Sequence, residues 1–284
     1  MGLFDRITSL FGSDTTDTGR GENHGTGGPP VGGGGQQLDA GQPGPSMQSH
    51  GSHWDTLVPD DGREATIKDQ VMEAVSTGEP IEGVDLDGTP VTGHRVQDGP
   101  LGTVAVSVGQ QIATAYPVAE GVTHTVDMTE LNEWEAGIEA WLSGTLADAR
   151  ITTFASNYFQ YPAERFGGEC DVSLAILMYT VGQADNEVVV DEQGNEQEVS
   201  SDFAGFRPWE RGAPDDYVLR TTIDTVEPIS YGKFDAYRIE APLFRTPDEQ
   251  EFDVALYVGT HLIDDEPHPG DQIEGAGWMQ AWFK

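Results

Sequence analysis

The densest group of side chains that could do chemistry lies near the end of the sequence, in the stretch THLIDDEPHPGD. Its titratable members are His261, Asp264, Asp265, Glu266, His268 and Asp271. Imidazoles and carboxylates suit a divalent metal ion or an acid–base pair. Pro267 and Pro269 splay this loop, however, whereas a metal site needs ligand spacings that fix its geometry. We therefore interpret the stretch as a solvated acidic turn and predict no metal site and no catalytic residue in it.

The local motifs of common enzyme classes are absent from the sequence. It contains no GxSxG, HExxH, CxxC, P-loop or dinucleotide-binding fingerprint. Cys170 is the only cysteine, which excludes an intrachain disulfide and a multi-thiolate metal site. His124 stands in a strand-like alternation, so we interpret it as a surface histidine or one whose hydrogen bonds are satisfied. We predict a protein that is not an enzyme and needs no cofactor; an enzyme of unknown type is the third interpretation.

Arginine and aromatic residues interleave most closely in FRPWER, which holds the candidate ligand surface Arg207, Trp209 and Arg211. Such a surface suits single-stranded nucleic acid, because bases stack on the rings and phosphates meet the cations. The alternative is that the aromatic residues fill turns and the arginines form ion pairs. The formal net charge of -35 disfavours a polyanionic ligand, so binding of nucleic acid is the second interpretation of function.

A different surface is predicted at the start of the chain, in GLFDRITSLFGS. Its apolar residues recur at the spacing of one helix face: Leu3, Phe4, Ile7, Leu10 and Phe11. A nine-residue helix is about 14 Å long and does not persist alone in water. The gain from burying this face and the entropy lost on ordering the segment nearly cancel, so one copy is expected to bind a membrane weakly and reversibly.

Two further interpretations of this apolar face stay open: docking on a protein, and no function. Several copies on one assembly would raise the avidity for a membrane by about 10²–10⁴. We therefore also expect self-association or an unknown protein partner.

Residues 13–53 are rich in glycine, proline and polar side chains and hold almost no apolar anchor. Such a stretch buries too little surface to offset the entropy of ordering. We predict a disordered linker here, between an amphipathic helix at residues 1–12 and the folded part. As a flexible coil the linker would span about 36 Å root-mean-square.

The charge balance describes the solvent more than it describes a partner. The chain has 49 acidic and 14 basic residues, only three of them lysines. This composition resembles the acidic proteome of halophilic archaea, in which carboxylates keep protein surfaces hydrated. At molar salt the screening length is about 3 Å, so repulsion between the carboxylates is largely removed.

The sequence also bears on location in the cell. No run of 18 apolar residues and no secretory signal is present. A lone cysteine fits a reducing compartment. We predict a cytoplasmic protein that lies peripherally at the inner face of the cell membrane.

The folded part is predicted to comprise a helix-plus-strand subdomain at residues 54–132 and a β-domain at residues 133–284. The helix lies in PDDGREATIKDQVMEAVSTGEP, where Asp60 and Asp61 are candidate caps and Gly78 ends the pattern. Its buried face is expected to be formed by Ile67, Val71 and Val75.

Strand signals dominate the remainder. They occur in GTVAVSVGQQIATAY, in IEAWLSGTLADARITTF around a turn at Ala147-Asp148, and in CDVSLAILMYTV. An acidic insertion follows, with a small hairpin at residues 193–195. Four more strand candidates are YVLRTTIDTVEPISYG, KFDAYRIEAPLF, EFDVALYVGTHL and DQIEGAGWMQAWF. Closely spaced strands predict a mainly β fold whose antiparallel sheet curls or closes, and Gly275 and Gly277 would allow a bend or a close backbone approach.

The run from Trp134 onward resembles an uncharacterised prokaryotic family of OB-like β-domains. The residues that carry this resemblance are Trp141, Gly144, Phe154, Tyr158, Phe159, Gly270, Asp271, Gly275 and Trp278. The resemblance implies an OB-like barrel and no activity, because all of these are residue types that a barrel needs in its core and bends. The start MGLFDRI is similar to the membrane-binding starts of phage-shock and vesicle-inducing proteins. The order of short helix, linker and β-domain resembles prokaryotic cell-division anchors.

These observations predict a non-enzymatic binding or scaffolding protein. Its N-terminal helix tethers it to the membrane surface, and its OB-like β-domain recruits a partner or self-associates. Single-stranded nucleic acid is the alternative ligand.

Overall fold

The computed structural model describes residues 53–134, 136–184, 188–190, 196–198 and 203–284. This part of the chain is mainly β, as the sequence predicts. The predicted helix at residues 1–12 and all of the predicted linker except His53 lie outside the described residues. Within the described part, none of the helices has the length and apolar character needed to cross a membrane.

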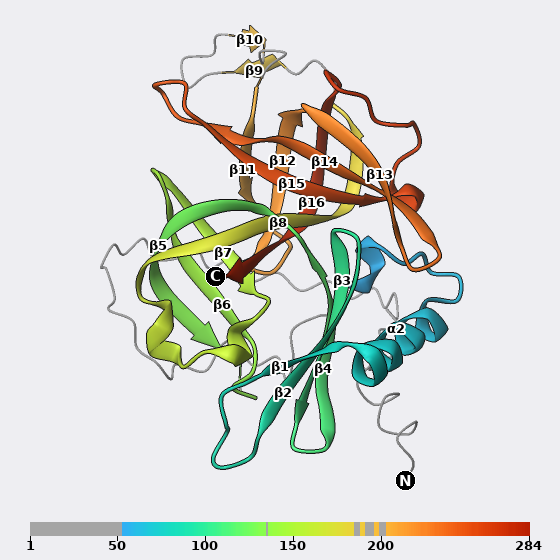
Figure 1. Cartoon of the computed structure of the whole chain (residues 1–284). Coiled ribbons are helices and arrows are strands. Elements are labelled where there is room, and N and C mark those ends of the chain that lie inside the picture. The colour runs from blue at the N-terminus through green and yellow to red at the C-terminus, as the bar shows by residue number, and fades with distance from the viewer. Residues whose placement is uncertain (1–52, 135, 185–187, 191–195, 199–202) are drawn as a thin grey trace, which may run out of the picture.

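The elements follow one another in the order seen in Figure 1. The helical ones are η1 (Trp54–Thr56), α2 (Arg63–Thr77), η2 (Tyr158–Gln160), η3 (Ala163–Phe166) and η4 (Thr260–Leu262). The first eight strands are β1 (Glu79–Glu82), β2 (Val91–Asp98), β3 (Leu101–Val108), β4 (Gln111–Ala119), β5 (Val122–Glu133), β6 (Ala140–Leu146), β7 (Ala149–Ala155) and β8 (Gly168–Gln183). The others are β9 (Val188–Val190), β10 (Glu196–Glu198), β11 (Gly205–Pro208), β12 (Asp216–Thr222), β13 (Thr225–Tyr231), β14 (Phe234–Arg245), β15 (Glu251–Gly259) and β16 (Gln272–Phe283).

Five of the strands close into a barrel in the order β5, β6, β7, β16, β8 and back to β5. Neighbours in this ring are antiparallel except β7 and β16, which run parallel. The barrel is filled by alternate residues of each strand, which is the period expected of a half-buried strand. Its buried core includes Val126, Leu142, Ile151, Leu174, Ile176 and Ala281.

Two strands of the barrel, β8 and β16, continue beyond it into a second sheet. Strand β12 and then β11 extend this sheet beside β16, and β15, β14 and β13 extend it beside β8. The pair β8–β15 is the second parallel pair in a sheet that is otherwise antiparallel among the described strands. Both parallel pairs join strands that are separated by long connections, as parallel pairing requires.

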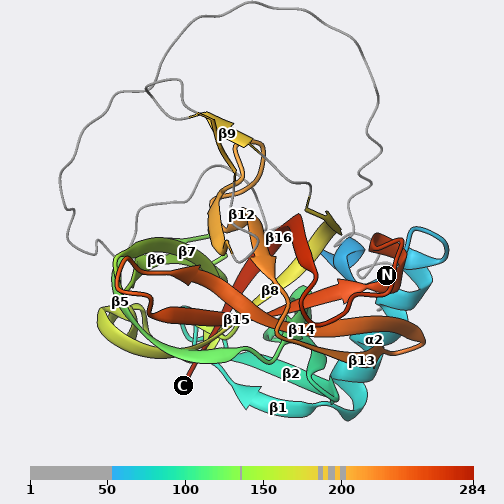
Figure 2. The same cartoon turned by 90° about the horizontal axis from the view of Figure 1, so that it is seen from above.

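A third layer is formed by the antiparallel sheet β1–β4 and helix α2, seen below and beside the barrel in Figure 1 and from above in Figure 2. It packs on the outer faces of β7, β8, β15 and β16. The shared core of this interface includes Leu57, Val104, Tyr116, Phe154, Leu177, Tyr257 and Trp278.

Helix α2 confirms the predicted helix, but its N-terminal cap differs from the prediction. Gly62 occupies the cap position at φ 74°, and no side chain caps the helix. Asp60 instead forms an ion pair with Arg63, the first residue of the helix, at 2.7 Å. Ile67 and Val71 are buried as expected.

Three strand predictions were tested closely by the fold. The segment YVLRTTIDTVEPISYG forms two strands, β12 and β13, rather than one. The chain breaks at Ile223 and Asp224, whose N–H groups bond the carbonyl oxygens of Asp271 and Glu240 instead of continuing one ladder. Strands β9 and β10 pair on either side of the predicted hairpin turn. The strand-like alternation around His124 lies in β5, which begins at Val122.

The predicted close approach at Gly275 is confirmed. A Cβ there would lie 2.1 Å from the carbonyl oxygen of Thr180 on β8. The register between the two strands shifts just beyond this point, between Ala276 and Gly277. A side chain at Gly275 would therefore force the shared strands apart.

We expect Gly275→Ala to lower the free energy of unfolding by about 1–3 kcal/mol or more, the cost of overpacking a tight contact. Denaturant unfolding in molar KCl measures this change. The matched control is Gly182→Ala on β8, where a Cβ meets nothing within 4 Å. We expect the control to stay within about 0.5 kcal/mol of the natural chain, and equal losses in the two variants would contradict the role given to Gly275.

Candidate functional site

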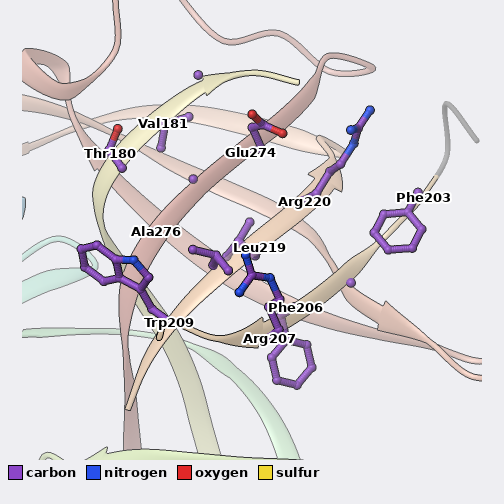
Figure 3. A pocket seen from close by; sticks show the side chains of 14 residues that line it. Thr180, Val181, Phe203, Phe206, Arg207, Trp209, Leu219, Arg220, Glu274 and Ala276 are labelled. Carbon is purple, nitrogen blue, oxygen red and sulfur yellow. The ribbon is translucent and has the colours of Figure 1, made fainter. Parts of the chain in front are cut away.

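A groove of about 740 Å³ lies over β8, β16, β12 and β11 (Figure 3). Its floor includes three small residues of the shared strands, Thr180, Gly182 and Ala276. Ala276 pairs with Thr180, and Gly182 pairs with the larger Glu274. Because Thr180, Gly182 and Ala276 carry little side-chain volume, the outer face of the sheet is hollow here. The described lining residues are Thr180, Val181, Gly182, Phe203, Gly205, Phe206, Arg207, Trp209, Val218, Leu219, Arg220, Glu274, Gly275 and Ala276.

Aromatic side chains stand at the walls of this groove. Trp209 and Phe203 lie on opposite sides of it in Figure 3, with Arg207 between them. Phe203 is 44% exposed, which is unusual for a phenylalanine beside a sheet. The walls therefore offer apolar and stacking contacts to a ligand.

Among the described lining residues, the charged ones are Arg207, Arg220 and Glu274. Arg207 is largely exposed and lies 3.9 Å from the Glu210 carboxylate, a distance at which an ion pair is weak. Arg220 is buried and donates from Nη2 to Oε1 of Gln272 at 2.6 Å. It also lies opposite Glu274 in the register of β12 and β16. The groove therefore offers charges of both signs beside its aromatic walls.

A partly buried polar cluster lies against the groove, and we call it the anchor cluster: His53, Tyr179, Asp215, Asp216 and Trp278. The Tyr179 hydroxyl donates to Oδ1 of Asp216 at 2.7 Å. It therefore accepts from Nδ1 of His53 at 2.6 Å, since its single proton is already used. The His53 ring lies 4.4 Å from the Trp278 ring, and Trp278 Nε1 donates to Oδ2 of Asp215 at 2.7 Å.

The carboxylates of this cluster are buried but hydrogen-bonded. Besides Tyr179, Asp216 accepts from the backbone N–H of Ala213 at 2.7 Å. Burial, reinforced by the nearby carboxylates of Asp216 and Asp215, holds the pKa of Tyr179 well above its ordinary value. The phenol therefore stays protonated at neutral pH and acts as a hydrogen-bond donor rather than as a base or nucleophile.

The anchor cluster fixes where the chain enters the fold. Thr180, in the groove floor, follows Tyr179 directly, and the Tyr179 ring lies 6.0 Å from the Trp209 ring in the groove wall. His53, which the sequence analysis places in the linker, is therefore packed into the fold at the edge of the groove. Its contacts with Tyr179 and Trp278 come from β8 and β16, and no local pattern around residue 53 reveals them.

The predicted site residues are brought together only in part. Arg207 and Trp209 both line the groove, whereas Arg211 lies in the turn after Trp209 and is not a lining residue. The predicted membrane-binding residues Leu3, Phe4, Ile7, Leu10 and Phe11 lie outside the described residues.

The predicted acidic turn, in the stretch THLIDDEPHPGD, lines a separate and smaller hollow of about 150 Å³ beside the end of β8. Its described lining includes Asp264, Asp265, Glu266 and Asp271. Across the described ranges, no group of three or more histidine, cysteine or acidic residues is arranged to hold a metal ion. The two histidines of this stretch have other contacts. His261 Nε2 bonds the carbonyl oxygen of Asp55, far away in the sequence, at 3.0 Å, and the backbone N–H of His268 donates to Oδ2 of Asp271 at 2.8 Å.

Several groove residues carry no signal in the sequence. In the sequence, Phe203 is an aromatic residue in a loop, and Arg220 and Glu274 are ordinary strand positions. Only the pairing of β12 with β16 brings Arg220 and Glu274 together. The small residues at positions 180, 182 and 276 make the hollow only because the register of β8 and β16 aligns them.

No family model, curated protein or solved structure matches this chain. The groove and the anchor cluster are therefore interpreted from their own geometry.

Tyr179→Phe removes the hydroxyl that joins His53 to Asp216. We expect a loss of about 1–3 kcal/mol in unfolding free energy, because buried polar groups lose a partner. We also expect faster amide hydrogen exchange at residues 53–58. Tyr237→Phe is the matched control, since the described structure shows no hydrogen bond for the Tyr237 hydroxyl. Unchanged exchange at residues 53–58 in Tyr179→Phe would contradict the anchoring role.

Proposed function

We propose that this protein is a non-enzymatic binding protein that is held peripherally at a membrane by residues 3–11 and takes a ligand or partner in the groove. One observation carries the proposal: the groove and the point where the preceding chain joins the fold lie on the same patch of β8 and β16. A tether that joins at this patch would keep the binding surface close to whatever the N-terminal segment contacts.

The barrel is, in this proposal, OB-like. In chain order its strands are β5, β6, β7, β8 and β16, and the last two exchange places in the ring, as in a five-stranded Greek-key barrel. OB-type barrels use the connection between their fourth and fifth strands for ligands. Here that connection runs from β8 to β16 and supplies Phe203, Arg207 and Trp209 to the groove.

The chemistry of the anchor cluster supports binding rather than catalysis. Tyr179 is held in its protonated form, and its hydroxyl is committed to Asp216 and His53. The buried carboxylates accept bonds from a backbone N–H and from an indole. These hydrogen bonds of Tyr179, Asp215 and Asp216 hold the strands under the groove in place, which suits a preformed binding surface.

Membrane contact is tested by sedimentation with neutral phosphatidylcholine vesicles in molar KCl, where apolar insertion is the remaining attraction. We expect the full chain to sediment with the vesicles and a chain lacking residues 2–12 to stay in solution. Leu10→Asp should reduce binding at least tenfold, because it puts a charge on the apolar face. Ser9→Asp, on the opposite face, is the control. Equal binding by the full and shortened chains would overturn the membrane role.

A second candidate ligand is single-stranded nucleic acid, favoured by Trp209, Phe203 and Arg207 lining one groove. Base stacking on an aromatic ring is worth about 1–3 kcal/mol per base, so Trp209→Ala should weaken oligonucleotide binding by about tenfold. Because the net charge of -35 repels a polyanion, binding should strengthen as KCl rises toward molar.

Fluorescence anisotropy with a labelled thymidine oligonucleotide measures both effects. Arg207→Ala should also weaken binding, while Arg150→Ala, an exposed arginine paired with Glu130 on the barrel, should not. Oligonucleotide affinity that is absent at every salt concentration, or insensitive to Trp209, would remove this candidate.

A further inference from the structure

Residues 1–52 join the described fold at the edge of the groove. The junction is fixed by the 2.6 Å hydrogen bond from His53 to Tyr179 and by the packing of the His53 ring on Trp278 at 4.4 Å. Tyr179 in turn touches the groove wall through Trp209. Whatever precedes residue 53 therefore starts from this patch of β8 and β16.

The groove and the start of the sequence match in chemical type. The groove offers the exposed ring of Phe203 and the apolar side chains of Trp209 and Ala276, flanked by Arg207 and Glu274. The segment at residues 3–11 carries five large apolar residues on one helical face and one residue of each charge, Asp5 and Arg6, on the other side. An amphipathic segment laid in a groove is a recurrent mode of peptide recognition.

We propose that the apolar face of residues 3–11 binds in the groove of its own chain when no membrane is present, so that membrane and groove compete for it. This inference rests on the proposed function, in which the same face contacts the membrane. Docking would shield Phe203 and the apolar face together. A membrane would withdraw the segment and open the groove to its ligand, coupling the two binding events.

The length of the connection makes this contact accessible. The chain between Phe11 and His53 spans about 35 Å root-mean-square if it behaves as a flexible coil. A linker of this kind gives an effective concentration of the order of millimolar. An intrinsic dissociation constant a few-fold below this concentration, still close to the millimolar range, would fill the groove most of the time, which is in keeping with a short segment of marginal affinity.

Hydrogen exchange followed by mass spectrometry in molar KCl tests the proposal on the full chain. We expect amides at residues 205–212 and 218–220 to exchange several-fold more slowly in the full chain than in the chain lacking residues 2–12. Leu10→Asp should abolish this protection, and Ser9→Asp on the opposite face should keep it. Phosphatidylcholine vesicles should raise the exchange of the full chain to that of the shortened one.

A second measurement uses the competition itself. Trp209→Ala weakens the binding of residues 3–11 in the groove, so the full chain carrying it should bind vesicles several-fold more tightly. Arg150→Ala should leave vesicle binding unchanged.

Equal exchange at residues 205–212 in the full and shortened chains overturns the inference, even if vesicles bind. Protection that grows with protein concentration assigns the contact to a second copy and also overturns it. Protection without any vesicle binding contradicts the proposed membrane role and supports docking in the groove.

Discussion

The structure depends on two strands that belong to two sheets at once. Strands β8 and β16 pair with each other from the barrel into the second sheet, and the missing side chain at Gly275 lets their backbones pass at a distance that no Cβ would allow. The barrel, the second sheet and the layer formed by β1–β4 and α2 all pack on this pair. The groove is a consequence of the same constraint, because the small residues that permit the close pairing also leave its floor open.

Next to this close pairing, buried polar groups give the patch its rigidity. A buried carboxylate is costly unless donors surround it. Asp216 has donors in Tyr179 and the Ala213 N–H, and Asp215 has one in Trp278. These bonds tie three strands and the entering chain at His53 to one another. A surface held in this way binds without first paying for its own ordering.

The formal charge of -35 predicts a solvent of high salt, and such a solvent bears on the forces that this surface can use. In molar salt, charges further apart than about 3 Å would scarcely interact. Stacking and apolar contact are not screened, and salts that are excluded from protein surfaces strengthen them. Trp209 and Phe203 in the groove, and the apolar residues at the start of the chain, are the kinds of side chain that work under these conditions.

Local patterns in the sequence determined the mainly β class, helix α2 with its buried Val71, the β3–β4 and β6–β7 hairpins and the close approach at Gly275. Each depends on residues near one another in the chain, where periodicity and turn residues act directly. The break between β12 and β13, the two parallel pairs and the packing of His53 were decided by the tertiary structure. So was the site: Arg207 and Trp209 share a groove with Glu274 only because strands distant in sequence pair in one register, and register is set by the packing of the whole core rather than by any local stretch.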